Sequence, residues 1–596
     1  MQLKKFIILT FLFLGFQLSA QSDALARQYF EDGAFEKAAL YYKKLYDKKP
    51  QRIDYLQYLV ECYQQLEKYD QVEALLLPKV KLPNFSPSFL VELGYNYTLQ
   101  RKEEEAHKYY EMAIARIDLN PGYAFVVGNS FKRKSLLDYA LKTYQRSMEL
   151  KPNNNLNLEI ARIYGEKGEI EKMFGSYLEL ISKNKVYQPN ILRNISQFIG
   201  EDPREENNIL FKRVLLKKLQ TDPDVLWNEL LSWLFIQQKQ YKSAFVQERA
   251  ILRRAEIYDI QRIINLGLTC LDNDDLKTAK EIFEYVIENS NDRSIQLRAH
   301  LYILEFELKQ APPKDYAKIE EQYKVLIQEF GVYPETLGLQ TAYAKFLAFY
   351  KDETDTAQRL LKESLELPLN RFQQASVKTT LADILVYDEK FNQALIYYSQ
   401  VQKSLKNHVI AQTARFKVAK TSFYKGDFDW SLTQLKVLRS STTQLIANDA
   451  MQLSLLISDN SLEDSTQTAL KIFAKADLLA YQNKNRKAID LLEKILVDHK
   501  GESIEDEALL RQGKLLEAEK QYDKARLNYI KILEFFGTDI LADDALYALG
   551  ELYSNYLDDP EKAKEFYERI ILNHGDSIFA VEARKKYRKL RGDAIN

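Results

Sequence analysis

Apolar and small side chains return along this chain with a period of 34 residues. In four consecutive repeats a small or aliphatic residue is followed three positions later by an aromatic one: Ala26 and Tyr29, Val60 and Tyr63, Gly94 and Tyr97, Gly128 and Phe131. The second half of each repeat carries an aliphatic residue and, four positions later, a large apolar one: Ala38 and Tyr42, Val72 and Leu76, Ala106 and Tyr110, Ala140 and Tyr144. Spacings of three and four residues are typical of helix faces. The pattern therefore predicts an all-α chain built from stacked antiparallel helix pairs.

The same order of residues resembles the tetratricopeptide repeat (TPR) family. The resemblance covers most of residues 22–590 and implies a right-handed α-solenoid of about 12–14 repeats. In such a chain each repeat packs on its neighbours, so length adds repeats and not domains. In TPR proteins the first helix of each pair lines a concave groove, and this resemblance directs the search for partner-binding residues there.

Breaks in the pattern divide the chain into segments. We predict a signal peptide at 1–20, a regular array at 21–182, a divergent helical segment at 183–222, a central array at 223–439, an inserted helix with a polar linker at 440–468, and a C-terminal array at 469–596. The divergent segment holds two amphipathic runs without the repeat signature and allows a bend. Prolines at 312 and 313 separate two further helices.

The inserted segment contains apolar residues at helical spacing, which predict an extra helix at 445–457 capped by Ser440–Thr443. A helix added to a solenoid can fill the groove, dock a partner or only extend the packing, and the sequence leaves these alternatives open.

The last hundred residues resemble the repeats of Gram-negative envelope proteins such as outer-membrane assembly lipoproteins and cell-division coordinators. Gly501, Gly537 and Gly575 each precede a first helix, and we expect glycine to close one helix and Ser or Asp to cap the next. The chain lacks the lipid-bearing cysteine of those lipoproteins. A membrane tether is therefore expected to come through a partner.

The first residues predict export. Lys4 and Lys5 precede the apolar run 6–16, and Ala20 ends a small-residue cleavage site. This is the layout of a secretory signal, and the alternative is a buried first helix. The 84 basic and 85 acidic residues nearly cancel, so no global field favours nucleic acid. We expect a periplasmic protein that associates peripherally with the outer membrane through a partner.

No catalytic motif, cofactor motif or metal-ligand spacing is present in the sequence. The five histidines stand alone, and Cys62 and Cys270 fall on predicted packing positions, too far apart in the stack for a disulfide. We therefore predict a protein that is not an enzyme and needs neither cofactor nor metal.

Partner-binding candidates lie on the predicted groove. Tyr95, Asn129, Lys132 and Arg133 fall on adjacent first helices, and an amide with cations resembles part of the carboxylate clamp of TPR co-chaperones. Ordinary solvated groove residues are the alternative. Trp233 is expected to face the groove as an anchor for a partner side chain, with core packing as its alternative.

A cationic run near the C-terminus is the one strong charge cluster. It contains Arg584, Lys585, Lys586, Arg588 and Lys589. The run can solvate the outer face of a capping helix, or it can dock on an acidic partner or on anionic headgroups.

These features predict a periplasmic scaffold that binds other envelope proteins or peptide segments in outer-membrane assembly, secretion or cell-wall maintenance. The alternative is chaperone-like capture of unfolded or peptide clients, motivated by Trp233 and by the inserted helix.

Overall fold

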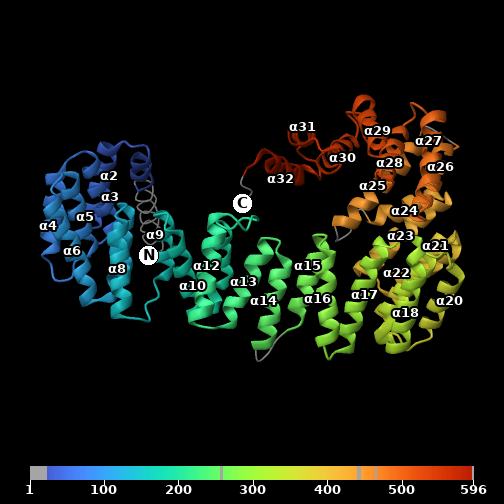
Figure 1. The fold of residues 1–596 in the computed structure, drawn as a ribbon. Helices are drawn as coiled ribbons and strands as arrows, with labels where there is room; N and C mark the ends of the chain where they lie inside the picture. Colours follow the sequence, from blue (N-terminus) through green and yellow to red (C-terminus); the bar gives the residue numbers. More distant parts are fainter. Residues whose placement is uncertain (1–22, 255–258, 439–443, 463–465, 594–596) are drawn as a thin grey trace, which may run out of the picture. The chain divides into compact units, whose positions relative to one another are not determined.

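The computed structural model describes residues 23–254, 259–438, 444–462 and 466–593. Over these residues the chain is helical without any β-strand, and consecutive helices pack in pairs (Figure 1). The predicted all-α solenoid of helix pairs is confirmed. The predicted signal peptide and the capping residues Ser440–Thr443 lie outside the described residues.

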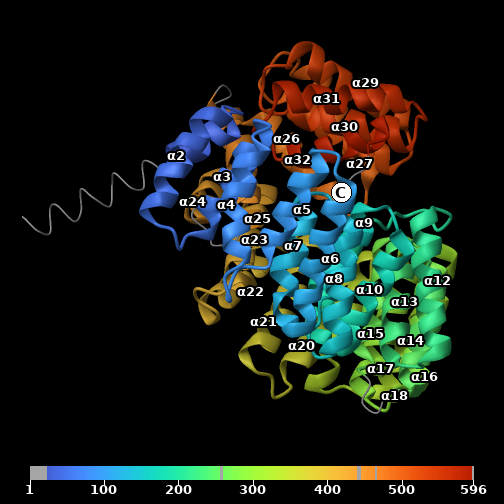
Figure 2. The same cartoon turned by 90° about the vertical axis from the view of Figure 1, so that its left-hand side faces the viewer.

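The chain forms two compact units, residues 1–256 and 257–596. The division falls inside the segment 223–439 that the sequence predicts as one central array. Residues 23–31 are helical. The further helices of unit 1, coloured from blue to green in Figure 2, are α2 (Phe35–Lys48), α3 (Ile53–Gln65), α4 (Tyr69–Val80), α5 (Ser88–Leu99), α6 (Glu103–Leu119), η1 (Pro121–Tyr123), α7 (Ala124–Arg133), α8 (Leu137–Leu150), α9 (Asn157–Glu166), α10 (Ile170–Lys183), η2 (Lys185–Tyr187), α11 (Gln188–Ser196), α12 (Glu206–Thr221), α13 (Val225–Gln237) and α14 (Tyr241–Arg254).

Unit 2 continues with the same kind of helix. Its helices are α15 (Gln261–Asp272), α16 (Leu276–Asn289), α17 (Arg293–Gln310), η3 (Pro313–Asp315), α18 (Tyr316–Phe330), η4 (Pro334–Thr336), α19 (Leu337–Phe349), α20 (Thr354–Leu365), α21 (Arg371–Tyr387), α22 (Phe391–Ser404), α23 (Val409–Lys425), α24 (Phe428–Leu438), α25 (Gln444–Leu462), α26 (Thr468–Tyr481), α27 (Asn485–Asp498), α28 (Glu505–Ala518), α29 (Tyr522–Phe535), α30 (Ala542–Asn555), α31 (Pro560–Asn573) and α32 (Ala580–Arg591). The prolines at 312 and 313 fall between α17 and α18, as predicted.

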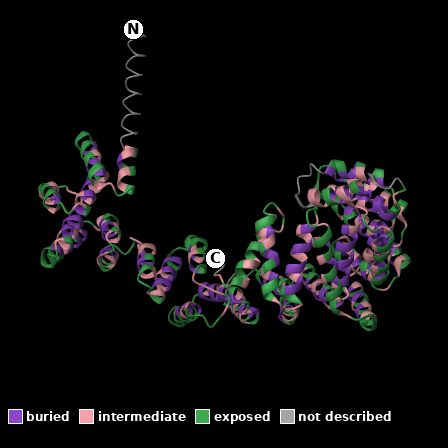
Figure 3. Ribbon diagram, turned by 90° about the horizontal axis from the view of Figure 1, so that it is seen from above, coloured by how far each residue is buried: buried purple, intermediate pink, exposed green. Residues whose placement is uncertain are grey.

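The repeating residues explain why the pairs form. Glycine on a first helix lies beneath the aromatic ring that stands 16 or 17 positions later on the second helix, as Gly94 with Tyr110, Gly128 with Tyr144 and Gly550 with Tyr567. A side chain at the glycine would overlap the ring, so its absence sets how closely the two helices approach. The rings are buried, and the buried faces of the helices turn toward their neighbours (Figure 3, purple). Apolar burial of this kind supplies most of the stability of short helices.

Tight turns join the two helices of most pairs. The turn residue adopts positive φ, and in several repeats it is not glycine, as with Glu67 (φ 56°), Arg101 (φ 61°) and Ser135 (φ 57°). These three positions are 34 residues apart. An L-residue in this region costs about 1–2 kcal/mol, which the packing of the two helices offsets.

The divergent segment consists of two helices, α11 and α12. The short helix α11 contacts α10 only lightly, and α10 packs directly on α12. The two amphipathic runs predicted at 191–199 and 209–219 thus correspond to real helices, shifted by a few residues.

The extra helix predicted at 445–457 is also present, as the longer α25. Its buried residues Ala450, Leu453 and Ile457 join the core formed by α23 and α24. First helix α26 packs directly on first helix α23, so the stack of first helices continues past the insertion.

The helix ends of the last repeats differ from the expectation. The C-cap residues are His499, Phe536 and His574, and the glycines come one to two residues later; the N-cap residues that follow, Ile504, Leu541 and Phe579, make no side-chain capping hydrogen bond. The prediction that glycine closes one helix and Ser or Asp caps the next is wrong. An apolar residue occupies the N-cap because its side chain is buried or half-buried against the repeat.

Candidate interaction surfaces

The predicted clamp residues come from first helices α5 and α7, and each contacts another part of unit 1. The Asn129 side-chain oxygen accepts a hydrogen bond from the Tyr144 hydroxyl at 3.1 Å. Lys132 pairs with Glu159 of α9 at 3.7 Å. Arg133 is exposed and donates to Gln57 of α3 at 3.5 Å. Lys132 and Arg133 thus link their repeat to other repeats of unit 1, whereas Asn129 is held within its own helix pair.

Lys134 organises this face and was missed from the sequence. Its side chain is only 6% exposed, and its ammonium lies 3.2 Å from the Glu92 carboxylate, which is 4% exposed. The same ammonium lies 4.8 Å from the centre of the Tyr95 ring and donates to Gln64 of α3 at 3.3 Å. A buried ion pair is costly to break from one side. Lys134 falls in a turn and not at a groove position of the repeat, so only the fold could identify it.

Trp233, on first helix α13, is half-buried. Its ring meets the buried ring of Phe211 edge-on, with centroids 6.2 Å apart. Phe211 belongs to α12, so Trp233 contacts the preceding repeat and keeps part of its surface open.

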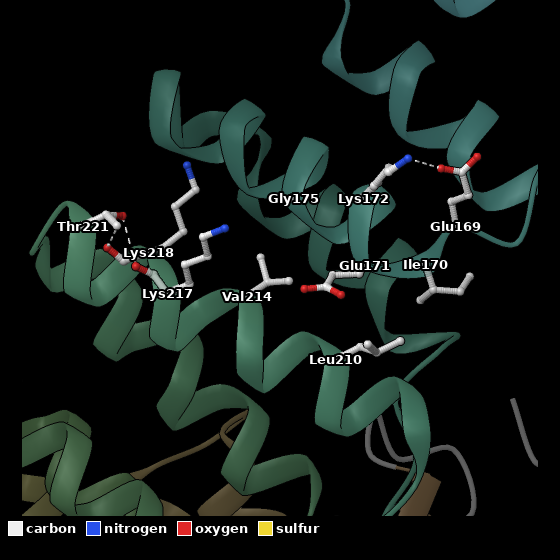
Figure 4. A pocket seen from close by; sticks show the side chains of 10 residues that line it. All are labelled: Glu169, Ile170, Glu171, Lys172, Gly175, Leu210, Val214, Lys217, Lys218 and Thr221. Atoms are coloured by element: carbon white, nitrogen blue, oxygen red, sulfur yellow. Dashed lines mark hydrogen bonds and ion pairs between the residues drawn. The ribbon is translucent and has the colours of Figure 1, made fainter. Parts of the chain in front are cut away.

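A groove of about 690 Å³ lies between second helices α10 and α12. Side chains from both helices line it (Figure 4). Its floor includes Ile170, Leu210 and Val214, and its rim carries charges of both signs. On that rim Lys172 pairs with Glu169 at 2.5 Å. The mixed and internally paired rim gives the groove no net preference for a charged ligand.

The basic run forms the last helix, α32, which packs on α31. Ala580 and Ala583 are buried toward the preceding repeat. Lys586 pairs with Glu551 of α30 at 2.6 Å. The other predicted residues, Arg584, Lys585, Arg588 and Lys589, are exposed. One cation of the run thus holds the helix in place, and four remain at the surface.

A ladder of ion pairs joins the first helices of unit 2. Asp383 of α21 pairs with Lys417 of α23 at 2.6 Å. Asp477 of α26 pairs with Lys420 of α23 at 2.6 Å and with Arg511 of α28 at 2.7 Å. The ladder continues to α32 through the Glu551–Lys586 pair already described. Acidic and basic first helices therefore alternate along the stack, which favours one order of packing.

Asp477 is the most enclosed member of this ladder. It is 7% exposed, and burial raises the pKa of its carboxyl while Lys420 and Arg511 lower it, with a net shift below the usual value. The carboxylate therefore stays charged at neutral pH and holds both cations. The sequence shows the charges but not their pairing, because the helices that carry them are separated by α24 and α25.

A partly buried acid, Glu507, lies where α25 meets α28. Desolvation, with a further contribution from neighbouring Asp506, raises the pKa of Glu507 to about 9. Asn460 of α25 donates to its carboxyl at 3.3 Å, and Ser503 donates to the Asn460 side-chain oxygen at 2.7 Å. Glu507 is therefore neutral at pH 7, and the contact ties the inserted helix to the first helix of a later repeat.

The cysteines are buried and unpaired, as predicted. Desolvation raises the pKa of both thiols to about 12, which leaves them unreactive at neutral pH. Within the described ranges no three His, Cys, Asp or Glu side chains gather in a way that could hold a metal ion. In the same ranges no helix is long and apolar enough to cross a membrane.

Two known proteins show a distant resemblance to this chain. No protein-family model matches it. The TPR repeat-containing protein MJ1428 of Methanocaldococcus jannaschii is 27% identical over 169 residues, which cover 27% of this chain and 29% of that protein. A solved structure, Naa15/Naa10 bound to HypK-THB, aligns over 96% of both chains with 14% identity and a TM-score of 0.28, too low to bear on fold or function. The helix-pair repeats and the archaeal relative together support a TPR-like repeat protein.

Proposed function

We propose that this chain is a non-enzymatic scaffold that binds other proteins in the periplasm of a Gram-negative cell. TPR-like solenoids present long surfaces assembled from many repeats, and such surfaces suit protein partners. The observation that carries the proposal is the unbroken stack of first helices in unit 2, which continues from α23 to α26 past the inserted helix. The predicted export signal and the resemblance of the last repeats to those of envelope proteins motivate the compartment.

Partners in outer-membrane assembly, secretion or wall maintenance fit this proposal. The exposed cations of α32 offer one docking point for an acidic protein, and the half-open Trp233 offers another for an apolar side chain. Both lie on helices held by ion pairs or aromatic contacts, so they are presented rigidly.

Affinity capture tests the scaffold. The tagged chain is expressed in its native cell, cross-linked and purified, and its compartment is followed by fractionation. Recovery of the same few envelope proteins in replicate experiments, with the chain in the periplasmic fraction, is the expected result. Recovery of cytosolic proteins alone, or of none above an untagged control, argues against it.

Capture of unfolded clients is the second candidate, because Trp233 keeps part of its ring surface open. This function predicts that excess protein suppresses aggregation of an unfolded reporter, and that Trp233→Ala weakens the effect. An unchanged aggregation rate at excess protein eliminates this candidate and leaves the scaffold untouched.

A further inference from the structure

Exposed apolar side chains gather on one edge of unit 1. In the repeats from α4 to α11, the segments that join a second helix to the next first helix all lie on this edge, since consecutive helices run antiparallel. Leu82 is 58% exposed, Leu119 72%, Phe125 55% and Val186 78%. Each follows or ends a second helix, or begins a first helix. We call this row the apolar edge.

The opposite edge is different. It is formed by the turns 66–68, 100–102, 134–136 and 167–169, whose two large apolar residues, Leu66 and Leu136, are half-buried. Leu99, which ends α5 beside one of these turns, is 36% exposed, so the same helices expose less apolar surface at this end than at the other. Packing within the repeats does not require this asymmetry.

Exposed lysines lie next to the apolar residues of this edge. Lys81 precedes Leu82, Lys151 follows α8 and Lys185 precedes Val186, and all three are exposed. Among the described residues none of them has an ion-pair partner. Two acids on the edge, Asp118 and Glu149, are both paired with Arg146. The free charge of the edge is therefore positive.

We propose that the apolar edge docks on the headgroup layer of an anionic bilayer. Neighbouring helix pairs are about 10 Å apart, so the tips form a stepped row roughly 30 Å long and not one continuous patch. A fluid lipid surface can accommodate separate apolar side chains at any spacing, whereas a protein partner needs a surface of complementary shape. Lysines are compact hydrated charges suited to lipid phosphates, and apolar insertion together with a basic surface is the combination that gives stable peripheral binding.

This inference goes beyond the proposed scaffold, because it concerns the surface on which the chain sits and not the proteins that it holds. The chain can bind lipid through the apolar edge even if the scaffold proposal is wrong, and it can act as a scaffold even if the edge binds no lipid.

Vesicle flotation with the full chain tests the edge. Wild-type protein is expected to float with vesicles of phosphatidylglycerol and phosphatidylcholine and to remain behind with phosphatidylcholine alone, with binding that weakens as salt is raised. Two triple variants probe the two parts of the edge: L82S/L119S/V186S for the tips, and K81E/K151E/K185E for the charge. Each is expected to lower binding at least about tenfold.

The matched control is K43E/K68E/K108E, which changes the net charge equally at three exposed lysines away from the edge. Its binding is expected to stay within about twofold of wild type. Circular dichroism checks that every variant retains its helices. An absence of wild-type binding to anionic vesicles overturns the proposal, and so does an equal loss in the control. Capture of an acidic protein through the edge without vesicle binding would assign it to a protein partner and also overturn the lipid assignment.

Discussion

Individual residues set the distance between the two helices of a repeat. An alanine Cβ at Gly550 would lie 2.5 Å from Cε1 of Tyr567, and moving the side chain away would break the hydrogen bond that the Tyr567 hydroxyl donates to Glu551 at 2.6 Å. We expect Gly550→Ala to lower the free energy of unfolding by about 1–3 kcal/mol. Urea denaturation measures it.

Gly575 provides the control, since its nearest neighbour for a new Cβ lies 4.0 Å away. Gly575→Ala should change stability by less than about 0.5 kcal/mol. Equal effects at the two positions would mean that the glycines serve the turn and chain flexibility and not the helix contact.

The Glu507 carboxyl gives unit 2 a pH dependence. Its pKa is raised to about 9 in the folded chain and is about 4.3 in an unfolded one. Between these values the folded state binds more protons, so stability is greatest at low pH and falls as the pH rises toward 9, by at most about 1.4 kcal/mol per pH unit. Glu507→Gln mimics the neutral form, and we expect it to flatten this decline.

The measurement is urea denaturation of wild type and Glu507→Gln at about pH 6, 7 and 8, which lie between the unfolded and folded pKa values of Glu507. Glu534→Gln, at an exposed position, is the control and should follow wild type. A wild-type stability that rises over this range contradicts the assignment of a neutral buried Glu507.

At the scale of elements, the turn inside each pair departs from what the sequence suggests. Arg101 holds a φ of 61° where glycine is the usual residue. We expect Arg101→Gly to be neutral or stabilising, by up to about 1 kcal/mol. Lys108→Gly, in the middle of α6, should instead destabilise by about 1 kcal/mol. Thermal unfolding compares the two, and a loss at both positions would contradict the strained turn.

The ion-pair ladder is the second element-scale feature. Asp477→Ala removes the one carboxylate that Lys420 and Arg511 share, and we expect a loss of about 3 kcal/mol. Asp355→Ala also breaks a pair between repeats, with Lys390, but its side chain is 89% exposed. That variant should lose less than about 1 kcal/mol. Urea denaturation measures both losses. Similar losses for the two variants would show that burial of the carboxylate does not determine how much an ion pair stabilises the fold.

The helices could be predicted from the sequence because the apolar spacing that defines each helix lies within a single repeat. The four-residue spacing of Ala106 and Tyr110 predicts a second helix. The inserted helix is predicted in the same way from Ala450, Leu453 and Ile457. What could not be predicted depends on contacts across repeats. Lys134 reaches α3 over 70 residues, and Asp477 pairs across the insertion with α23.

For the candidate binding residues, too, the sequence predicted positions but not contacts. The groove positions of the repeat pointed to Asn129 and Lys132, and the structure shows which side chains each of them contacts. Their partners Tyr144 and Glu159 lie on other helices, so the sequence offered no sign that Asn129 is held within its own helix pair or that Lys132 links two repeats. The apolar edge was equally hidden, because Leu82 and Val186 look like ordinary apolar residues until their exposure is known.

At the scale of the whole molecule, the account holds that a TPR-like solenoid serves to bind other proteins. A photoreactive amino acid at Arg133, on the first-helix face, tests this most directly when the chain is irradiated in its native cells. The same residue at Lys108, on the outside of a second helix, gives the background. The account predicts discrete adducts with envelope proteins from Arg133 and few from Lys108. No adducts from Arg133, or the same diffuse pattern from both positions, would contradict it.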